Sequence, residues 1–404
     1  MSAKGRPERE LHPLLGATKL ASVGASLVDI AVAAAAIALG GVWLWAFLST
    51  DSVWLFASLI AVAILALAFF QRFDVAGRYG RALATRPRLA TLFAVLATVG
   101  VAAGLHDDAY PLLMLCTVLL FVVACIGLTI QTGYCGIVNF AGAAFFGTGA
   151  YTAAVLVAHG VPHLIAIIAG GVVAGVVGSL LILPVLRTRG YYAALVTIAF
   201  GILFSTFLEV NNALGGPQGL KLPGIDLFGW KFNHDVQLAG AGASFYVNYF
   251  VLSLALALAA FVFARRVERS WLGLAFDAVR LDETAAAAFG IGVARAKIIA
   301  FTLGNLLCGI AGATYAMMQG FIAPNNFTFG ESLILVSIVI LGGIGNPVGI
   351  VPAALVIIVV PQKLQFIQEY RFLLYGCVVI LILLFRPEGL LPRPLRNYFP
   401  ESSA

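Results

Sequence analysis

The segment "RRVERSWLGLAFDAVRLDETAAAAFGIGVARAK" occupies residues 265–297 and separates two long apolar runs. Lipid cannot solvate its charges, so the segment must lie outside the hydrocarbon of a membrane. Asp282 can cap a short helix there, and Gly290 can end it. Three residues of that helix are predicted to share one face: Ala285, Ala286 and Phe289.

This short helix is suited to docking against another protein. Its small side chains allow a partner surface to approach closely, and nearby charges can orient the partner through ion pairs. The charged residues are Arg280, Asp282 and Glu283. An ordinary loop helix without a partner is the alternative that the pattern leaves open.

Composition places the chain among membrane proteins. Of its 404 residues 61% are hydrophobic and only 10% are charged, and the mean hydropathy is +1.01. So few polar residues cannot cover a soluble globule of this size. The net charge of +6 does not indicate a nucleic-acid partner, because basic residues between apolar spans are typical of cytoplasmic loops. We therefore expect an all-α polytopic membrane protein.

Ten apolar runs are long enough to cross a bilayer as helices. They lie at about 27–48, 53–70, 89–105, 110–130, 135–158, 162–186, 191–210, 245–264, 298–318 and 371–385. Two shorter runs, 331–345 and 347–360, meet at "GGIGNP" and predict a re-entrant or broken-helix hairpin that enters and leaves on one side.

The distribution of lysine and arginine predicts that both termini are cytoplasmic. Alternating the loops collects most basic residues on one side, together with the 265–297 loop, and places the Gly/Pro-rich loop 211–244 outside. The predicted organisation is a cytoplasmic tail 1–26, an appended helix pair with its basic connector 27–88, a core 89–395 and a cytoplasmic tail 396–404.

Two glycine-dense segments interrupt the apolar pattern. In the first, glycines alternate with polar and aromatic residues, which suits a broken helix that lines a pathway for a polar solute. Its candidate pathway residues are Gly133, Tyr134, Gly136, Asn139, Gly142, Phe145, Gly147, Gly149 and Tyr151. The second segment adds Gly342, Gly343, Gly345 and Asn346. Tight helix packing is the alternative for the first segment, and a simple turn is the alternative for the second.

The sequence offers no site for bond chemistry. It contains no phosphate-binding loop of the form GxxxxGK[ST] and no GxSxG elbow, and its histidines and cysteines lack metal-ligand spacing. We therefore expect neither a metal nor a cofactor in this chain. The carboxylate of Glu331 is explained by its place at the start of the hairpin's first helix, where it complements the helix dipole.

Four segments resemble the permease subunits of branched-chain amino-acid ABC importers. They are "GYCGIVNFAGAAFFGTGAYTAAVL", "DETAAAAFGIGVARAKIIAFTLGNLLCGIAGATYA", "VILGGIGNPVGIVPAAL" and "LLYGCVVILILLFRPEGLLP". They follow the family's order over roughly residues 110–395. The N-terminal helix pair resembles an extension found on one of the two permease types. In the first segment, "GIVNFAGAAFFG" departs from the Leu-Ser-Leu-Gly motif that is usual in the family, which leaves the identity of the solute open.

The resemblance implies a heteromeric importer in the bacterial inner membrane. The chain would pair with a homologous second permease, two cytoplasmic ATP-binding subunits would hold ATP and Mg, and a periplasmic solute-binding protein would deliver leucine, isoleucine or valine. The docking helix would then be the coupling helix, and the 265–297 loop the coupling loop. A urea or short-amide importer is the alternative within transport. A stand-alone secondary transporter or channel is the alternative of another class.

Overall fold

The computed structural model describes three long stretches of the chain and a few isolated residues. The long stretches are 27–50, 87–186 and 192–363, without 228, 235, 239 and 240, and the isolated residues fall within 55–62 and 370–393. The predicted spans 53–70 and 371–385, both predicted tails and most of the basic connector therefore lie wholly or mainly outside the described residues.

The chain divides into two compact units, Met1–Leu105 and His106–Ala404. In the first unit, α1 (Leu27–Ser49) packs along α4 (Pro87–Gly104), and the indole Nε1 of Trp45 donates a hydrogen bond of 3.3 Å to the Gly104 carbonyl. Both helices match their predicted spans to within two residues.

The second unit is a helix bundle. Its long helices are α5 (Ala109–Leu128), α6 (Gly142–Ala158), α7 (His163–Leu186), α8 (Tyr192–Val210), α9 (Tyr246–Arg269), α12 (Val293–Gln319), α13 (Phe329–Gly342) and α14 (Pro347–Lys363). Six described stretches are long and apolar enough to cross a membrane: 109–134, 163–184, 192–210, 246–269, 293–319 and 324–342. The fold is therefore that of an all-α polytopic membrane protein.

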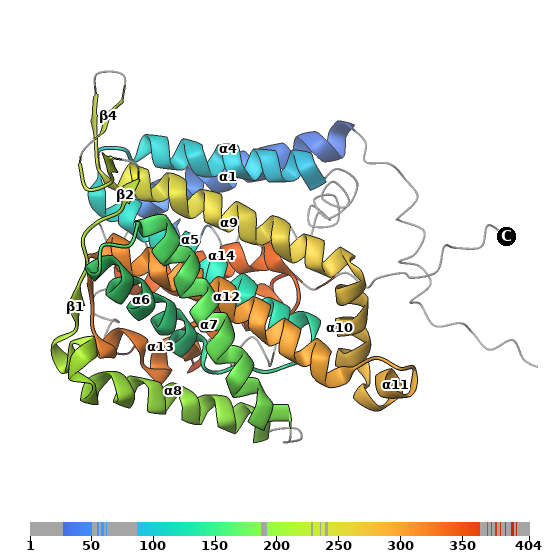
Figure 1. Cartoon of the computed structure of the whole chain (residues 1–404). Coiled ribbons are helices and arrows are strands. Elements are labelled where there is room, and N and C mark those ends of the chain that lie inside the picture. Colours follow the sequence, from blue (N-terminus) through green and yellow to red (C-terminus); the bar gives the residue numbers. More distant parts are fainter. Residues whose placement is uncertain are drawn as a thin grey trace, which may run out of the picture. The chain divides into compact units, whose positions relative to one another are not determined.

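Helix α12 forms the centre of this unit. It makes its most extensive contacts with α7, α6 and α5 (Figure 1). Small residues permit this close packing: a Cβ atom added at Gly149 of α6 would overlap the backbone of Gly309 on α12. The helix axes approach closely because neither residue has a side chain.

Short strands and 3-10 turns gather at one end of the second unit, opposite α10 (Trp271–Leu281) and α11 (Glu283–Ala288) (Figure 1). The antiparallel strand pairs are β1 (Leu220–Lys221) with β6 (Phe321–Ile322), β2 (Asp226–Leu227) with β3 (Trp230–Lys231), and β4 (Val236–Leu238) with β5 (Ala241–Ala243). The 3-10 turns are η4 (Asn212–Leu214), η5 (Gly216–Gln218) and η6 (Pro324–Phe327). Most of these elements belong to the 211–244 loop, and the β1–β6 pair joins that loop to the end of α12.

The structure moves the predicted boundary between the spans 110–130 and 135–158. Helix α5 continues through a π-helical turn, η3 (Thr129–Tyr134), the next seven residues are not helical, and α6 begins at Gly142. Gly136 adopts a φ of +78°, which favours glycine and breaks the helix. The Oδ1 atom of Asn139 then accepts a hydrogen bond of 2.8 Å from the Ala141 amide at the start of α6.

The 265–297 loop contains more helix than the sequence predicted. Helix α9 continues to Arg269, and its terminal arginines complement the helix dipole. Helix α10 follows, with Phe276, Asp277 and Val279 buried on one face. The predicted short helix is α11, so α10 and α11 form an arm of two helices in this loop.

The predicted reversal of the chain is present, although α13 lies in the stretch 324–342 that is long and apolar enough to cross a membrane. Helices α13 and α14 pack against each other, and the chain reverses at residues 343–346. Gly343 and Gly345 adopt φ values of +107° and +90°. These backbone conformations explain the glycines of the "GGIGNP" break.

Candidate functional site

Three buried side-chain amides form hydrogen bonds to one another next to the break between η3 and α6. The Nε2 atom of Gln131 donates to the Oδ1 atom of Asn305 at 2.8 Å and to the Phe301 carbonyl at 3.1 Å. The Nδ2 atom of Asn139 donates to the Oε1 atom of Gln131 at 2.8 Å. All three amide side chains are at most 1% exposed. The polar groups of Asn139 are thus used within the protein to join η3, the break and α12.

The glycines of the first dense segment contact other parts of the chain. A Cβ atom at Gly147 would lie 2.7 Å from Cε1 of Phe204 and 2.8 Å from Cγ of Phe327. A Cβ atom at Gly133 would overlap the backbone of Gly345, and one at Gly142 would lie 3.1 Å from the side chain of Leu335. With Gly149 against α12, these contacts match the packing alternative.

The aromatic candidates of the same segment lie in different surroundings. Phe145 is buried between Phe200, at a centroid distance of 5.3 Å, and Phe301, at 5.7 Å. Tyr151 lines an apolar cavity of about 690 Å³ between α6, α7 and α8. Tyr134 lies beneath the guanidinium of Arg393, with the Cζ atom 4.9 Å from the ring centroid. The three aromatic candidates therefore lie in three different surroundings.

Arg393 joins three elements that are distant in sequence. Its Nη1 atom lies 2.8 Å from the Oδ1 atom of Asp277 on α10, and its Nη2 atom lies 3.6 Å from the Oε1 atom of Glu268 on α9. Nη1 also donates to the Gly133 carbonyl at the end of η3, at 3.4 Å. The side chains of Arg393 and Asp277 are 10% and 8% exposed, so this ion pair is largely shielded from water.

Two residues shortly before Arg393 form hydrogen bonds with the hairpin at and next to its turn. The Leu390 amide donates to the Leu341 carbonyl at 2.8 Å, and the Nδ2 atom of Asn346 donates to the Leu391 carbonyl at 3.1 Å. A Cβ atom at Gly342 would lie 2.8 Å from the backbone of Gly349 on α14. The described residues 389–391 and 393 therefore connect the hairpin turn to α9 and α10.

The predicted docking helix has the predicted caps. The Oδ1 atom of Asp282 accepts hydrogen bonds from the amides of Thr284, at 2.8 Å, and Ala285, at 3.0 Å. Gly290 adopts a φ of +81°, and the amide of Ile291 donates to the Ala286 carbonyl, which closes the C-terminal turn.

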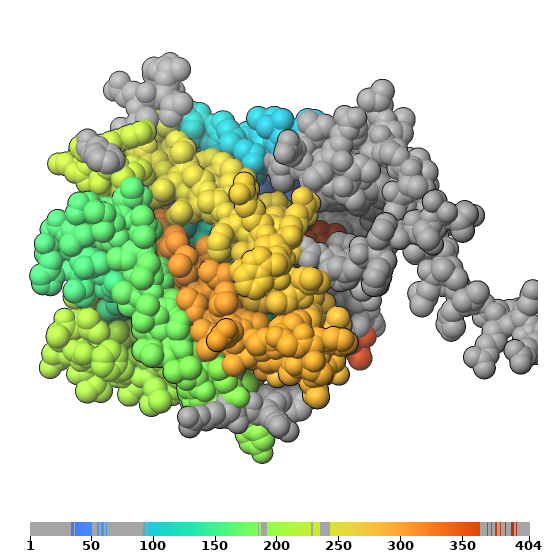
Figure 2. All heavy atoms as spheres, turned by 45° about the vertical axis from the view of Figure 1, so that its right-hand side comes forward, coloured from blue at the N-terminus to red at the C-terminus, as the bar shows by residue number. Residues whose placement is uncertain are grey.

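The exposed surface of this arm is more apolar than the sequence suggested. Ala286 faces inward, whereas Ala285 lies on the exposed side with Phe289, which is 88% exposed. Glu283 pairs with Lys297 at 2.7 Å, and Arg280 covers Gly136 and lies 3.8 Å from Asp277. The charges are therefore engaged within the chain. Trp271, Leu281 and Phe289 are large apolar side chains that stay exposed on or next to α10 and α11. Figure 2 shows the α10–α11 segment, in yellow-orange to orange, at the surface of the molecule.

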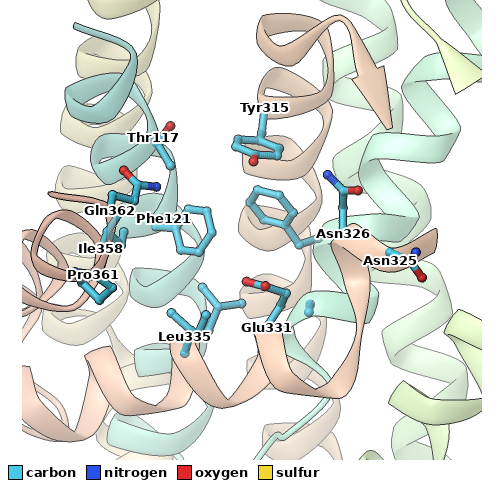
Figure 3. A pocket seen from close by; sticks show the side chains of 13 residues that line it. Thr117, Phe121, Tyr315, Asn325, Asn326, Glu331, Leu335, Ile358, Pro361 and Gln362 are labelled. Carbon is cyan, nitrogen blue, oxygen red and sulfur yellow. The ribbon is translucent and has the colours of Figure 1, made fainter. Parts of the chain in front are cut away.

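A cavity of about 330 Å³ lies between α5, α6, α12, α13 and α14 (Figure 3). Its polar lining residues are Thr117, Tyr315, Asn325, Asn326, Glu331 and Gln362. Aromatic and aliphatic side chains also line it, among them Phe121, Phe146 and Leu335. This mixture is typical of small-molecule sites.

No local sequence pattern singles out these cavity residues. Glu331 had a sufficient local explanation in the dipole of α13, and the other polar residues are scattered over segments 245 positions apart. The only signal available was the polar pair Asn325 and Asn326 next to an apolar helix. Recognising the site required the contacts between five helices.

Comparison with known proteins assigns the chain to a family. The family model described as the permease component of the branched-chain amino acid transport system matches residues 110–383. The chain is 33% identical over 289 residues to the high-affinity branched-chain amino acid permease protein LivM of Salmonella typhimurium, covering 68% of each chain. It is 32% identical to LivM of Escherichia coli K12, again over 68% of each chain.

The second permease type of these systems is also related. The chain is 24% identical over 286 residues to LivH of Escherichia coli K12, covering 67% of this chain and 90% of LivH. No solved structure matches the chain. By the family match and its LivM relatives, the chain belongs to the permease components of branched-chain amino acid transport systems.

Proposed function

We propose that this chain is the LivM-like permease subunit of an ATP-driven importer of leucine, isoleucine and valine. The match to the permease family over residues 110–383 carries the proposal. The higher identity to LivM than to LivH indicates which of the two permease positions the chain takes. A LivH-like chain would complete the pathway, two ATP-binding subunits would bind ATP and Mg at the cytoplasmic face, and a periplasmic binding protein would deliver the amino acid.

The proposed protein crosses the inner membrane ten times and has both termini in the cytoplasm. The sequence supports this orientation, because alternating the predicted loops groups most basic residues with the 265–297 loop. The short strands would then lie in the periplasm, where a binding protein can reach them. The α13–α14 hairpin would enter and leave from that side.

Cysteine labelling tests the orientation. Trp230 in β3 is 61% exposed, and Phe289 after α11 is 88% exposed. Four native cysteines are buried and Cys377 is exposed, so a Cys377→Ser background suits the assay. A membrane-impermeant maleimide applied to intact cells should label Trp230→Cys but label Phe289→Cys only after permeabilisation. Labelling of Phe289→Cys alone in intact cells would reverse the topology.

The α10–α11 arm would carry the movement of the ATP-binding subunits into the bundle. These subunits would contact the exposed apolar side chains of the arm. Arg393 connects α10 to Gly133 and, through the adjoining backbone, to the hairpin turn. Closure of the ATP-binding subunits would therefore shift packed elements together and would bias the bundle between inward-facing and outward-facing states.

Gly290→Val is expected to uncouple ATP hydrolysis from uptake. A β-branched residue at a φ of +81° costs about 1–2 kcal/mol and disturbs the end of α11. Gly292 is the matched control, because its φ is −72° and an added Cβ atom would make only ordinary contacts there. Complexes purified and reconstituted in proteoliposomes should show reduced uptake per ATP hydrolysed for Gly290→Val and a normal ratio for Gly292→Val. Equal uptake in the two variants would remove α11 from the coupling mechanism.

A further inference from the structure

One exposed stripe of α9 changes from apolar to basic near the end of the helix. Its residues are spaced three or four positions apart, so they share one face: Val251, Ala255, Leu258, Val262, Arg266 and Arg269. The opposite face is buried and packs mainly against α5. The stretch 246–269 is long and apolar enough to cross a membrane. The apolar part of the stripe is therefore suited to contact lipid chains.

The length of α9 would bring its terminal arginines to the level of the lipid headgroups. At 1.5 Å per residue its 24 residues span about 36 Å, slightly more than the roughly 30 Å thickness of the hydrocarbon core. The side chains of a helix lean toward its N-terminus, as Arg265 does by placing its guanidinium 5.3 Å from the centroid of the Phe261 ring. Arginines at this end of α9 therefore lean back toward the membrane.

The arginines of the stripe have no acidic partner in the described part of the chain. Arg266 and Arg269 are exposed, and neither forms an ion pair with another described residue. The neighbouring carboxylate of Glu268 lies 3.6 Å from Arg393 instead. Arg265 adds a third cation to the same end of the helix. This excess of positive charge attracts an anionic group, and an anion that carries apolar chains also matches the rest of the stripe.

From these observations we propose that the end of α9 binds an anionic phospholipid, with Arg266 and Arg269 contacting its phosphate and the apolar stripe contacting its acyl chains. By the proposed topology this lipid belongs to the inner leaflet, and its binding does not depend on which solute the chain transports. Only Ser270 separates α9 from α10, so the lipid would hold the point from which the arm extends (Figure 1). The arginines also complement the dipole of α9, but that role requires no lipid.

The test follows the thermal midpoint of the complete importer, purified in detergent and delipidated, as palmitoyl-oleoyl-phosphatidylglycerol is added. The lipid concentration that gives half of the maximal stabilisation should be roughly thirty-fold higher for Arg266→Gln/Arg269→Gln than for wild type, since each arginine near an anionic headgroup contributes about five-fold in affinity. Glutamine has nearly the helix propensity of arginine and removes its charge. Arg269→Gln alone should give a change of about five-fold, which keeps the test open if the double variant does not assemble.

A control variant removes two cations elsewhere. Lys221 in β1 and Lys231 in β3 are exposed and do not lie on the α9 stripe, so Lys221→Gln/Lys231→Gln should respond to phosphatidylglycerol as wild type does. Palmitoyl-oleoyl-phosphatidylcholine has the same chains but no net charge, and it should stabilise wild type much more weakly. Glycerol 1-phosphate has a phosphate but no chains, and it should not stabilise wild type.

Four results would contradict the proposal. An equal response to phosphatidylglycerol in wild type and both α9 variants would show that the arginines do not bind the headgroup. An equal response of wild type to phosphatidylcholine would show that the stripe contacts lipid without selecting its headgroup. Stabilisation by glycerol 1-phosphate would indicate a site for free phosphate esters. Loss of the second permease from the Arg269→Gln complex would identify the end of α9 as a protein interface.

Discussion

Substituting Arg393 with alanine is expected to destabilise the second unit by about 3–5 kcal/mol, since removing one partner of a buried ion pair leaves the other charge uncompensated. Asp277, whose side chain is 8% exposed, would lose its 2.8 Å contact. Glu268 would lose the same cation. The thermal midpoint of the purified complex in detergent should fall by many degrees, and uptake should be lost in parallel.

Two further variants make this expectation specific. Arg266 is an exposed arginine on α9, so Arg266→Ala should leave the thermal midpoint nearly unchanged. Adding Asp277→Asn to Arg393→Ala should restore part of the stability, because it neutralises the carboxylate that lost its partner. An unchanged thermal midpoint in Arg393→Ala would show that the residue does not join the hairpin turn to the arm.

Gly149→Ala is expected to separate α6 from α12 and to cost about 1–3 kcal/mol, the usual range for overpacking. The added Cβ atom would overlap the Gly309 backbone, which cannot move aside as a flexible side chain would. Gly100 in α4 is the matched control, because an added Cβ atom meets nothing within 4 Å. Gly100→Ala should be neutral or slightly stabilising, since alanine favours the helix.

Complex yield and thermal midpoint distinguish two possible roles of Gly149, packing against α12 and lining the translocation pathway. Loss of both in Gly149→Ala, with normal values in Gly100→Ala, is the result expected from packing against α12. A stable complex that hydrolyses ATP but does not transport would instead place Gly149 in the pathway. That result would contradict the role drawn from its contact with Gly309.

Features that depend on neighbouring residues could be predicted from the sequence. Asp282 and Gly290 define the two ends of α11 because caps require particular residue types at fixed spacing. The break at residues 343–346 was found for the same reason, since glycines with positive φ interrupt an apolar run. The helical course of α10 was missed because its amphipathic pattern lies within a charged segment.

Contacts between distant residues could not be predicted. Arg393 and Asp277 are 116 positions apart, and Gln131 and Asn305 are 174 positions apart. Asn139 is unusual in an apolar run, but its polarity predicts equally a solute contact or an internal hydrogen bond. In the structure its side chain donates a hydrogen bond to the Gln131 amide oxygen. Glu331 shows the opposite case, because a sufficient local explanation concealed its place in a cavity.

Uptake by the reconstituted importer tests the proposed function most directly. The chain is purified with its second permease and two ATP-binding subunits, placed in proteoliposomes and supplied with the binding protein and ATP. Leucine, isoleucine and valine should accumulate only when ATP and the binding protein are both present, and urea should not compete. Accumulation of urea or a short amide instead of these amino acids, or amino-acid uptake that needs neither ATP nor the other subunits, would contradict the assignment.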